Sequence, residues 1–204
     1  MENLPIVNIF SDYVCPWCYL GHSRIKKLLQ KNELNYKIIH FPLHPNTPSQ
    51  GQKLINLFNC SEDDLRIKND HMALLMKEEN LKFKPRTHTY NTRLAQEIGF
   101  WAEEINNNFN IHDIFYEYYF LKNKNLNDKN VLLEVIKSSG LDVLEGEKVI
   151  SKRLYKDKIS QQWKKSYEVG VTGVPTYQIN DKILVGAQPY EILENFIKTN
   201  INYV

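Results

Sequence analysis

Near its N-terminus the sequence reads Cys15-Pro16-Trp17-Cys18, two cysteines separated by two residues. A short apolar run, Ile6–Phe10, precedes this CxxC motif and has the length and composition of a strand. Pro16 suits the first position of a helix, where its missing N–H would have no partner in any case. A second strand-like run follows at Tyr36–Phe41, so the chain is predicted to begin as strand, helix, strand.

The cysteine pair stands where the first strand is expected to end and the helix to begin. Two sulfurs one helical turn apart can close a disulfide, and the positive end of the helix dipole favours the thiolate of the first sulfur. A CxxC beside β-α-β character is typical of thiol–disulfide exchange. The alternatives are half of a zinc site, two unreactive buried thiols, and a structural disulfide. His40 and His44 are candidate further zinc ligands, although they are more typical of loop or surface residues.

The remaining chain separates into a helical middle and an α/β end. After a proline-containing loop, helical periodicity runs for roughly a hundred residues, with Ser61 as a plausible N-cap. Thr176–Ile179 and Ile183–Val185, joined by a polar turn, read as a hairpin followed by a closing helix. The outline is therefore β-α-β, an all-helical insertion over residues 46–164, and β-β-α.

A second motif, Gly173-Val174-Pro175-Thr176, places a proline at the entrance to the late strand. Proline cannot donate a ladder hydrogen bond, so it belongs at the start of a strand or at an edge. A cis Val174–Pro175 bond would leave the backbone of Val174 available to an extended substrate peptide. Base rates alone favour the ordinary trans bond at this position.

Composition restricts the partners and the compartment. The net charge of +2 gives no electrostatic argument for nucleic acid or an anionic membrane as a partner. No apolar run approaches the roughly 20 residues of a transmembrane helix, and no secretory signal is recognisable, which predicts a cytoplasmic protein. Three cysteines do not make a disulfide scaffold, and Cys60, the third, is expected to be a half-buried, inert thiol.

Taken together, these motifs resemble the DsbA-like thioredoxin family, most closely its FrnE-type branch. The resemblance covers essentially the whole chain. The segments that carry it are Phe10–Gly21, Phe41–Pro45, Asn91–Ala95, Gly173–Thr176 and Gly186–Pro189.

The resemblance implies an α/β protein with a thioredoxin fold interrupted by a large all-helical insertion domain. The thioredoxin-like domain would comprise residues 1–45 and 165–204, and the insertion residues 46–164. Cys15 would be the exposed nucleophile and Cys18 the buried resolving cysteine, with Pro175 as a cis-proline facing both. The substrate-binding residues would be Pro16, Trp17, Val174, Pro175, Thr176 and Asn91.

One departure from the family pattern concerns the proton of the resolving cysteine. Thioredoxins place a buried carboxylate on the strand beneath the motif, and the matching position here is Asn8 or Ile9, neither of which ionises. Asp12 is close in sequence but is expected on the surface loop. The role of a proton-transferring carboxylate is therefore not transferred to any residue of this chain.

The expected activity is that of a thiol–disulfide oxidoreductase with protein disulfide isomerase activity, acting on disulfides or dithiols of proteins or peptides. No cofactor or metal is expected, although glutathione could serve as reductant or co-substrate. The first rival is a glutathione-dependent enzyme similar to 2-hydroxychromene-2-carboxylate isomerase or the kappa-class transferases, which typically carry serine where Cys15 stands. The second rival is a non-enzymatic CxxC module that binds metal or peptide.

Overall fold

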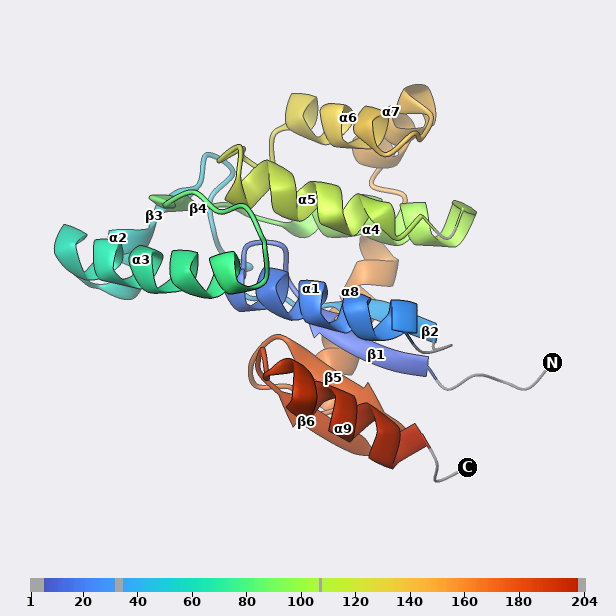
Figure 1. The fold of residues 1–204 in the computed structure, drawn as a ribbon. Coiled ribbons are helices and arrows are strands. Elements are labelled where there is room, and N and C mark those ends of the chain that lie inside the picture. Colours follow the sequence, from blue (N-terminus) through green and yellow to red (C-terminus); the bar gives the residue numbers. More distant parts are fainter. Residues whose placement is uncertain (1–5, 32–34, 107, 202–204) are drawn as a thin grey trace. The chain divides into compact units, whose positions relative to one another are not determined.

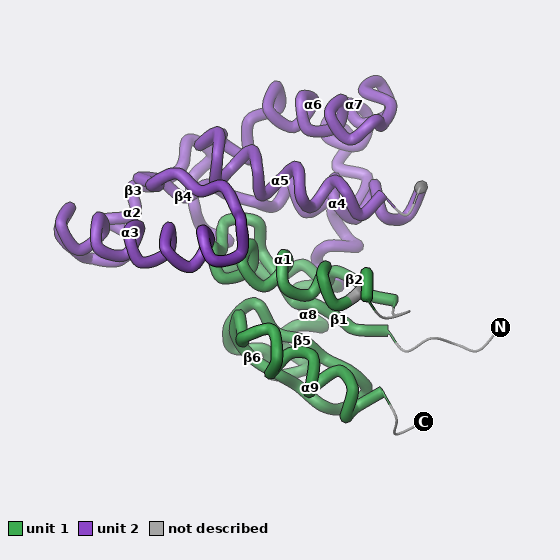
Figure 2. Tube along the Cα trace, in the orientation of Figure 1, with its two compact units in different colours: residues 1–43, 162–204 green, residues 44–161 purple. Residues whose placement is uncertain are grey.

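The computed structural model describes residues 6–31, 35–106 and 108–201. Contacts divide the chain into two units, which we call unit 1 (Met1–Leu43 with Gln162–Val204) and unit 2 (His44–Gln161). Figure 2 shows unit 1 in green and unit 2 in purple. Unit 2 is thus inserted between two segments of unit 1 along the chain.

Unit 1 alternates strands and helices, as labelled in Figure 1. Its elements are β1 (Ile6–Ser11), α1 (Pro16–Lys31), β2 (Asn35–His40), the end of α8 (Lys156–Glu168), β5 (Thr176–Ile179), β6 (Lys182–Val185) and α9 (Tyr190–Ile201).

Unit 2 is mainly helical. Its elements are β3 (Gln52–Lys53), α2 (Leu54–Phe58), α3 (Glu62–Glu78), β4 (His88–Thr89), α4 (Arg93–Asn106), α5 (Asn110–Phe120), α6 (Lys129–Ser138), α7 (Val143–Lys152) and the start of α8.

Unit 1 is built on a four-stranded sheet with the order β2-β1-β5-β6. β1 and β2 are parallel, because α1 carries the chain back across the sheet between them. β5 is antiparallel to β1, with Ile9 opposite Tyr177, and β6 is antiparallel to β5. The β-α-β and β-β-α segments around one sheet, interrupted by unit 2, are the predicted thioredoxin fold with its large insertion.

The two faces of this sheet carry separate apolar clusters, because side chains along a strand alternate between faces. On one face Ile9 and Tyr177 pack in a cluster with Ile25 of α1 and Leu193 of α9. On the other face Phe10 packs in a cluster with Ile39, Phe41 and Val171. Only three residues separate the end of β1 from the CxxC motif, so both clusters support its position.

The unit boundaries differ from the predicted domain boundaries by a few residues. Gln162 belongs to unit 1 because its side-chain oxygen accepts the backbone N–H of His40 at 2.9 Å, tying α8 to β2. Pro45 belongs to unit 2, where its carbonyl accepts a hydrogen bond from the Asn91 amide at 3.0 Å. Such contacts between distant segments leave no local signal in the sequence.

Unit 2 confirms the predicted N-cap and corrects the prediction of an all-helical insertion. Ser61 caps α3 in a capping box with Asp64, each side chain bonding the other's backbone N–H. β3 and β4, however, form an antiparallel two-stranded sheet inside the unit. Two-residue strands are too short to show the alternation from which a strand is predicted.

A buried carboxylate ties three segments of unit 2 together. The side chain of Glu97 is 1% exposed and accepts hydrogen bonds from Arg93 at 3.1 Å and from Arg153 at 2.6 and 3.0 Å. Arg93 also donates to the hydroxyl of Ser160 at 2.7 Å. The start of α4, the end of α7 and the start of α8 are therefore held by one charged network. Across the described ranges, no helix is long and apolar enough to cross a membrane.

Candidate active site

Cys15 and Cys18 lie at the junction of β1 and α1, as predicted. The backbone carbonyl of Cys15 accepts the N–H groups of Cys18 at 3.1 Å and Tyr19 at 3.2 Å, which begins the helix. Cys15 therefore stands immediately before the N-terminus of α1, at the positive end of the helix dipole. Both cysteines are free thiols in this structure.

The exposure of Cys15 is a correction to the sequence-based expectation. Cys15 is only 4% exposed, and Cys18 is 1% exposed, whereas the intervening Trp17 is 41% exposed. Pro16 is partly buried. The thiol of Cys15 donates a hydrogen bond to the carbonyl of Val174 at 3.5 Å, which places a second segment of chain against the sulfur.

The expectation that Asp12 lies on the surface is also wrong. Asp12 is buried, and its carboxylate accepts the backbone N–H groups of Val14 at 3.2 Å and Leu43 at 3.0 Å. One carboxylate thus holds the loop before Cys15 and joins it to the Phe41–Pro45 segment. The sequence places these partners far apart, so no local pattern could reveal the bond to Leu43.

The late proline motif lies beside the cysteine pair. The Val174–Pro175 bond is cis, as the family resemblance implied. Pro175 is buried, and its carbonyl accepts the backbone N–H of Gly186 at 2.7 Å, which draws in the Gly186–Pro189 segment. The hydroxyl of Thr176 donates to the carbonyl of Gly173 at 2.7 Å. Three motifs that are distant in sequence therefore meet in unit 1.

The two cysteines differ electrostatically. Burial raises the pKa of the Cys18 thiol well above its ordinary value, and the neighbouring Cys15 raises it further through hydrogen bonding and charge. Ser11 and the backbone of Asp12 oppose this shift by hydrogen bonding to the Cys18 sulfur. Cys18 is therefore a thiol at neutral pH, and its reaction as a nucleophile requires loss of that proton.

Two residues beside the cysteine pair, Gly21 and Tyr177, were not predicted from the sequence as site residues. A Cβ atom added to Gly21 would overlap the hydroxyl oxygen of Tyr177 and would lie 3.0 Å from Cγ of Pro175. Gly21 thus allows β5 and the proline loop to approach α1 closely. A glycine inside a helical pattern is a weak signal of close packing, but it does not name the partner.

Gly21→Ala is expected to lower the free energy of unfolding measured with urea. Overpacking at such a site costs about 1–3 kcal/mol, and over most of that range the ~1 kcal/mol that alanine gains over glycine in a helix offsets only part of the cost. Gly173→Ala is the matched control, because its added Cβ meets no atom within 4 Å. Adding Tyr177→Phe should recover part of the loss by removing the overlapped oxygen; a double variant as unstable as Gly21→Ala would contradict this packing.

Asn91 lies in unit 2, where its side chain makes hydrogen bonds within the fold. Its amide nitrogen donates to the carbonyls of Pro45 at 3.0 Å and Thr47 at 3.1 Å, and its oxygen accepts the N–H of Arg93 at 2.9 Å. Through these bonds Asn91 links the loop at Pro45 and Thr47 to the start of α4. Its substrate-binding role remains a prediction.

The two histidines considered as zinc ligands, His40 and His44, are both at least partly buried. His40 is buried at the end of β2, with its ring centroid 5.4 Å from that of Tyr13, so it is not a loop or surface residue. Burial lowers the pKa of His44, with a further contribution from Arg86. The described part of the chain contains no group of three or more His, Cys, Asp or Glu side chains able to hold a metal ion.

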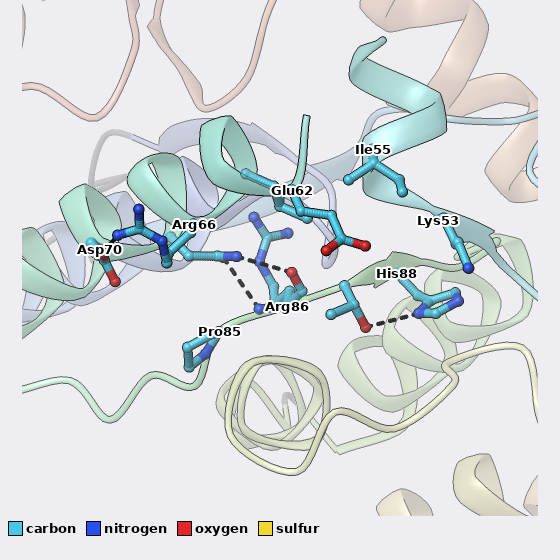
Figure 3. Close-up of a pocket in the computed structure, with 11 residues that line it drawn as sticks. Lys53, Ile55, Glu62, Arg66, Asp70, Pro85, Arg86 and His88 are labelled. Atoms are coloured by element: carbon cyan, nitrogen blue, oxygen red, sulfur yellow. Dashed lines mark hydrogen bonds and ion pairs between the residues drawn. The ribbon is translucent and has the colours of Figure 1, made fainter. Parts of the chain in front are cut away.

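A pocket of about 490 Å³ lies within unit 2 and contains none of the predicted site residues (Figure 3). Its polar walls bond one another. The Asn69 amide donates to the Arg86 carbonyl at 3.0 Å and accepts the Arg86 N–H at 3.2 Å, while Arg66 pairs with Asp70 at 3.7 Å. Cys15, Cys18 and Pro175, to which the sequence assigns the chemistry, lie in unit 1 and do not line this pocket.

The fold and the site define a thioredoxin-fold protein with a dithiol at the start of its first helix. The chain belongs to the DSBA-like thioredoxin domain family, whose model matches residues 6–198. It is 25% identical over 198 residues to the uncharacterized protein YwbO of Bacillus subtilis, with 94% of each chain covered.

Two solved structures share the fold. A probable DsbA oxidoreductase from Streptomyces coelicolor superposes with a TM-score of 0.91 at 24% identity, covering 98% of this chain and 91% of that one. A 2-hydroxychromene-2-carboxylate isomerase superposes with a TM-score of 0.74 at 20% identity, covering 95% of each chain. At these identities the two structures support the fold and do not separate the candidate activities.

Proposed function

We propose that this protein is a thiol–disulfide oxidoreductase that uses Cys15 and Cys18 as its redox pair. The observation that carries the proposal is the position of Cys15. Its sulfur stands at the N-terminus of α1, lies 3.5 Å from the carbonyl of Val174, and has a buried second thiol behind it. A helix N-terminus favours the thiolate, which is the reactive form of cysteine.

The two cysteines take different roles in the proposed reaction. The Cys15 thiolate attacks a substrate disulfide and forms a mixed disulfide with one substrate sulfur, while the other leaves as a thiolate. Cys18 then attacks the Cys15 sulfur, closes the Cys15–Cys18 disulfide, and releases the remaining substrate sulfur. When the reaction runs in this direction, the substrate disulfide is reduced. When the same steps run in reverse, a substrate dithiol is oxidised.

Substrate contacts are proposed on both sides of Cys15. Trp17 offers an exposed aromatic surface next to Pro16. On the other side Val174 lies against the Cys15 sulfur, and the adjoining Pro175 and Thr176, both buried, are proposed as substrate contacts on the family resemblance. The Val174 carbonyl accepts a hydrogen bond from the Cys15 thiol. Loss of the thiol proton to solvent, which precedes attack on the substrate, frees this carbonyl to accept a backbone N–H of the substrate. Asn91 is retained as a substrate contact on the family resemblance alone.

The substrate class, location and branch of the family are proposed on the same family resemblance. We propose protein or peptide disulfides and dithiols as substrates, protein disulfide isomerase activity, no bound cofactor, a cytoplasmic location and a FrnE-type relationship within the family. Glutathione is proposed as an alternative reductant. The rival, a glutathione-dependent isomerase or transferase, has the same fold but requires no second thiol, so the buried Cys18 favours dithiol chemistry.

The proposed function predicts a defined product from one turnover. Reduced protein mixed with one equivalent of a peptide disulfide should lose two hydrogens and release two peptide thiols, and peptide mapping should locate the new bond at Cys15–Cys18. Cys60→Ala is the matched control and should behave as the parent does, because Cys60 is not part of the proposed redox pair. Recovery of both cysteines as thiols, with the peptide disulfide intact, would contradict the proposal.

A further inference from the structure

A tyrosine hydroxyl is buried beside the cysteine pair without a hydrogen-bond partner in the described chain. Tyr177 on β5 is fully buried, and its hydroxyl oxygen has no partner. A buried hydroxyl without a partner destabilises the folded state, whereas phenylalanine would fill the same space without that penalty. A hydrogen-bond acceptor that forms only during the reaction would explain why a tyrosine stands at this position.

The register of the sheet and the packing of α1 indicate which partner this is. Tyr177 lies opposite Ile9 and packs in the cluster that contains Ile25 and Leu28 of α1. Its hydroxyl lies directly against Gly21, at the place where a Cβ atom would stand. Cys18 and Gly21 are three residues apart in α1, so they share one face of the helix. The hydroxyl therefore lies on the face of α1 that carries Cys18.

The charges around the hydroxyl agree with this placement. Burial raises the pKa of Tyr177 far above its ordinary value, and the nearby Cys18 and Cys15 raise it further, while Arg24 acts in the opposite direction. Tyr177 therefore stays protonated over the range in which thiols ionise, and it can act as a hydrogen-bond donor. A phenol in this position offers a donor to a sulfur anion without itself taking a charge.

We propose that Tyr177 is a positioning residue for the resolving step, donating a hydrogen bond from its phenol to the Cys18 sulfur as that sulfur becomes a thiolate. This inference rests on the proposed dithiol reaction and deepens it. Neither of the candidate positions beneath the motif, Asn8 and Ile9, ionises, but the strand next to them carries the phenol at the residue opposite Ile9.

Protons and electrons are conserved in the step that Tyr177 assists. The Cys18 thiol loses its proton, its electron pair forms the bond to the Cys15 sulfur, and the bond between Cys15 and the substrate sulfur breaks. The substrate sulfur leaves as a thiolate and takes up the proton that Cys18 lost, through solvent. The cysteine pair is oxidised, the substrate is reduced, and Tyr177 keeps its own proton throughout.

The groups that act on Cys18 come from three segments. The side chain of Ser11, at the end of β1, and the backbone of the next residue, Asp12, hydrogen-bond the sulfur, and Cys15 precedes α1. Tyr177 of β5 interacts with Cys18 through charge. Arg24 of α1 acts on Tyr177, while its guanidinium donates to the carbonyl of Ala187 at 2.8 Å. Removing the phenol should therefore leave a Cys18 that is harder to ionise.

Tyr177→Phe tests this directly in the full chain. Reduced protein is mixed with excess peptide disulfide, quenched with acid at intervals, and the mixed-disulfide and intramolecular-disulfide species are separated by mass. Capture by Cys15, which depends on peptide concentration, should change by less than about twofold. The resolving rate, which does not depend on peptide concentration, should fall about tenfold at pH 7, and its pH profile should move to higher pH by about one unit, as expected on loss of one hydrogen bond to a charged group.

The melting temperature of the variant distinguishes a positioning role of Tyr177 from a role in packing alone. The melting temperature of Tyr177→Phe should equal or exceed that of the parent, because the hydroxyl has no partner to lose. Tyr119→Phe is the matched control: its hydroxyl donates to the carbonyl of His88 at 2.8 Å in unit 2, so it should melt lower with an unchanged resolving profile. An unchanged resolving rate and pH profile in Tyr177→Phe would overturn the inference, whereas a parent protein that forms neither species would overturn the proposed function instead.

Discussion

Cys15→Ser is expected to abolish turnover with disulfide substrates, lowering the rate by at least about 1,000-fold, since loss of an enzyme's nucleophile commonly has an effect of this size or larger. The variant retains Cys18, but that thiol is buried and has a raised pKa, so it does not replace the lost nucleophile. A serine hydroxyl ionises far less readily than a thiol and does not form a disulfide. Reduction of insulin and refolding of a scrambled substrate are the two assays that measure the loss.

The same substitution should have little effect on the fold. The Cys15 thiol donates to the carbonyl of Val174, and a serine hydroxyl can donate to the same acceptor. We expect the free energy of unfolding to change by less than about 1–2 kcal/mol, within the usual range for a single substitution. Cys60→Ser controls for the loss of one thiol and should retain full activity; retained activity in Cys15→Ser would exclude Cys15 as the nucleophile.

Cys18→Ser is expected to convert the protein from a catalyst into a trap for its substrate. Cys15 keeps its place at the N-terminus of α1, so capture of a peptide disulfide continues. The resolving thiol is missing, so the mixed disulfide should persist at least about 100-fold longer than in the parent, because attack by a group held in place greatly exceeds attack by dilute thiols in solution. Intact-protein mass should show one peptide per chain, released by added reductant.

The control for trapping is a second substitution at the same position. Cys18 is fully buried, and a serine hydroxyl placed there is destabilising by about 1–3 kcal/mol if it finds no partner. Cys18→Ala avoids that hydroxyl and should trap the peptide equally well. If both variants release the peptide as fast as the parent does, then Cys18 is not the resolving cysteine.

Local patterns were sufficient to predict the elements that carry the chemistry. The apolar run before Cys15, the proline after it and the later hairpin are each readable within about ten residues, because strand and helix periodicity, turns and caps are local properties. The same holds for Ser61, whose capping box with Asp64 spans three residues of sequence. The sequence alone thus determined the order of elements in unit 1, the position of the cysteine pair at a strand–helix junction and the N-cap of α3.

Tertiary structure alone decided how these parts meet. Asp12 is buried because its carboxylate binds the backbone at Leu43, and Gln162 joins unit 1 because it bonds the backbone of His40. The hydroxyl of Tyr177 reaches Gly21 only because the antiparallel register of β1 and β5 sets Tyr177 opposite Ile9. These contacts join residues that are distant in sequence, and the packing of a closed core selects them, so the periodicity of a single segment carries no information about them.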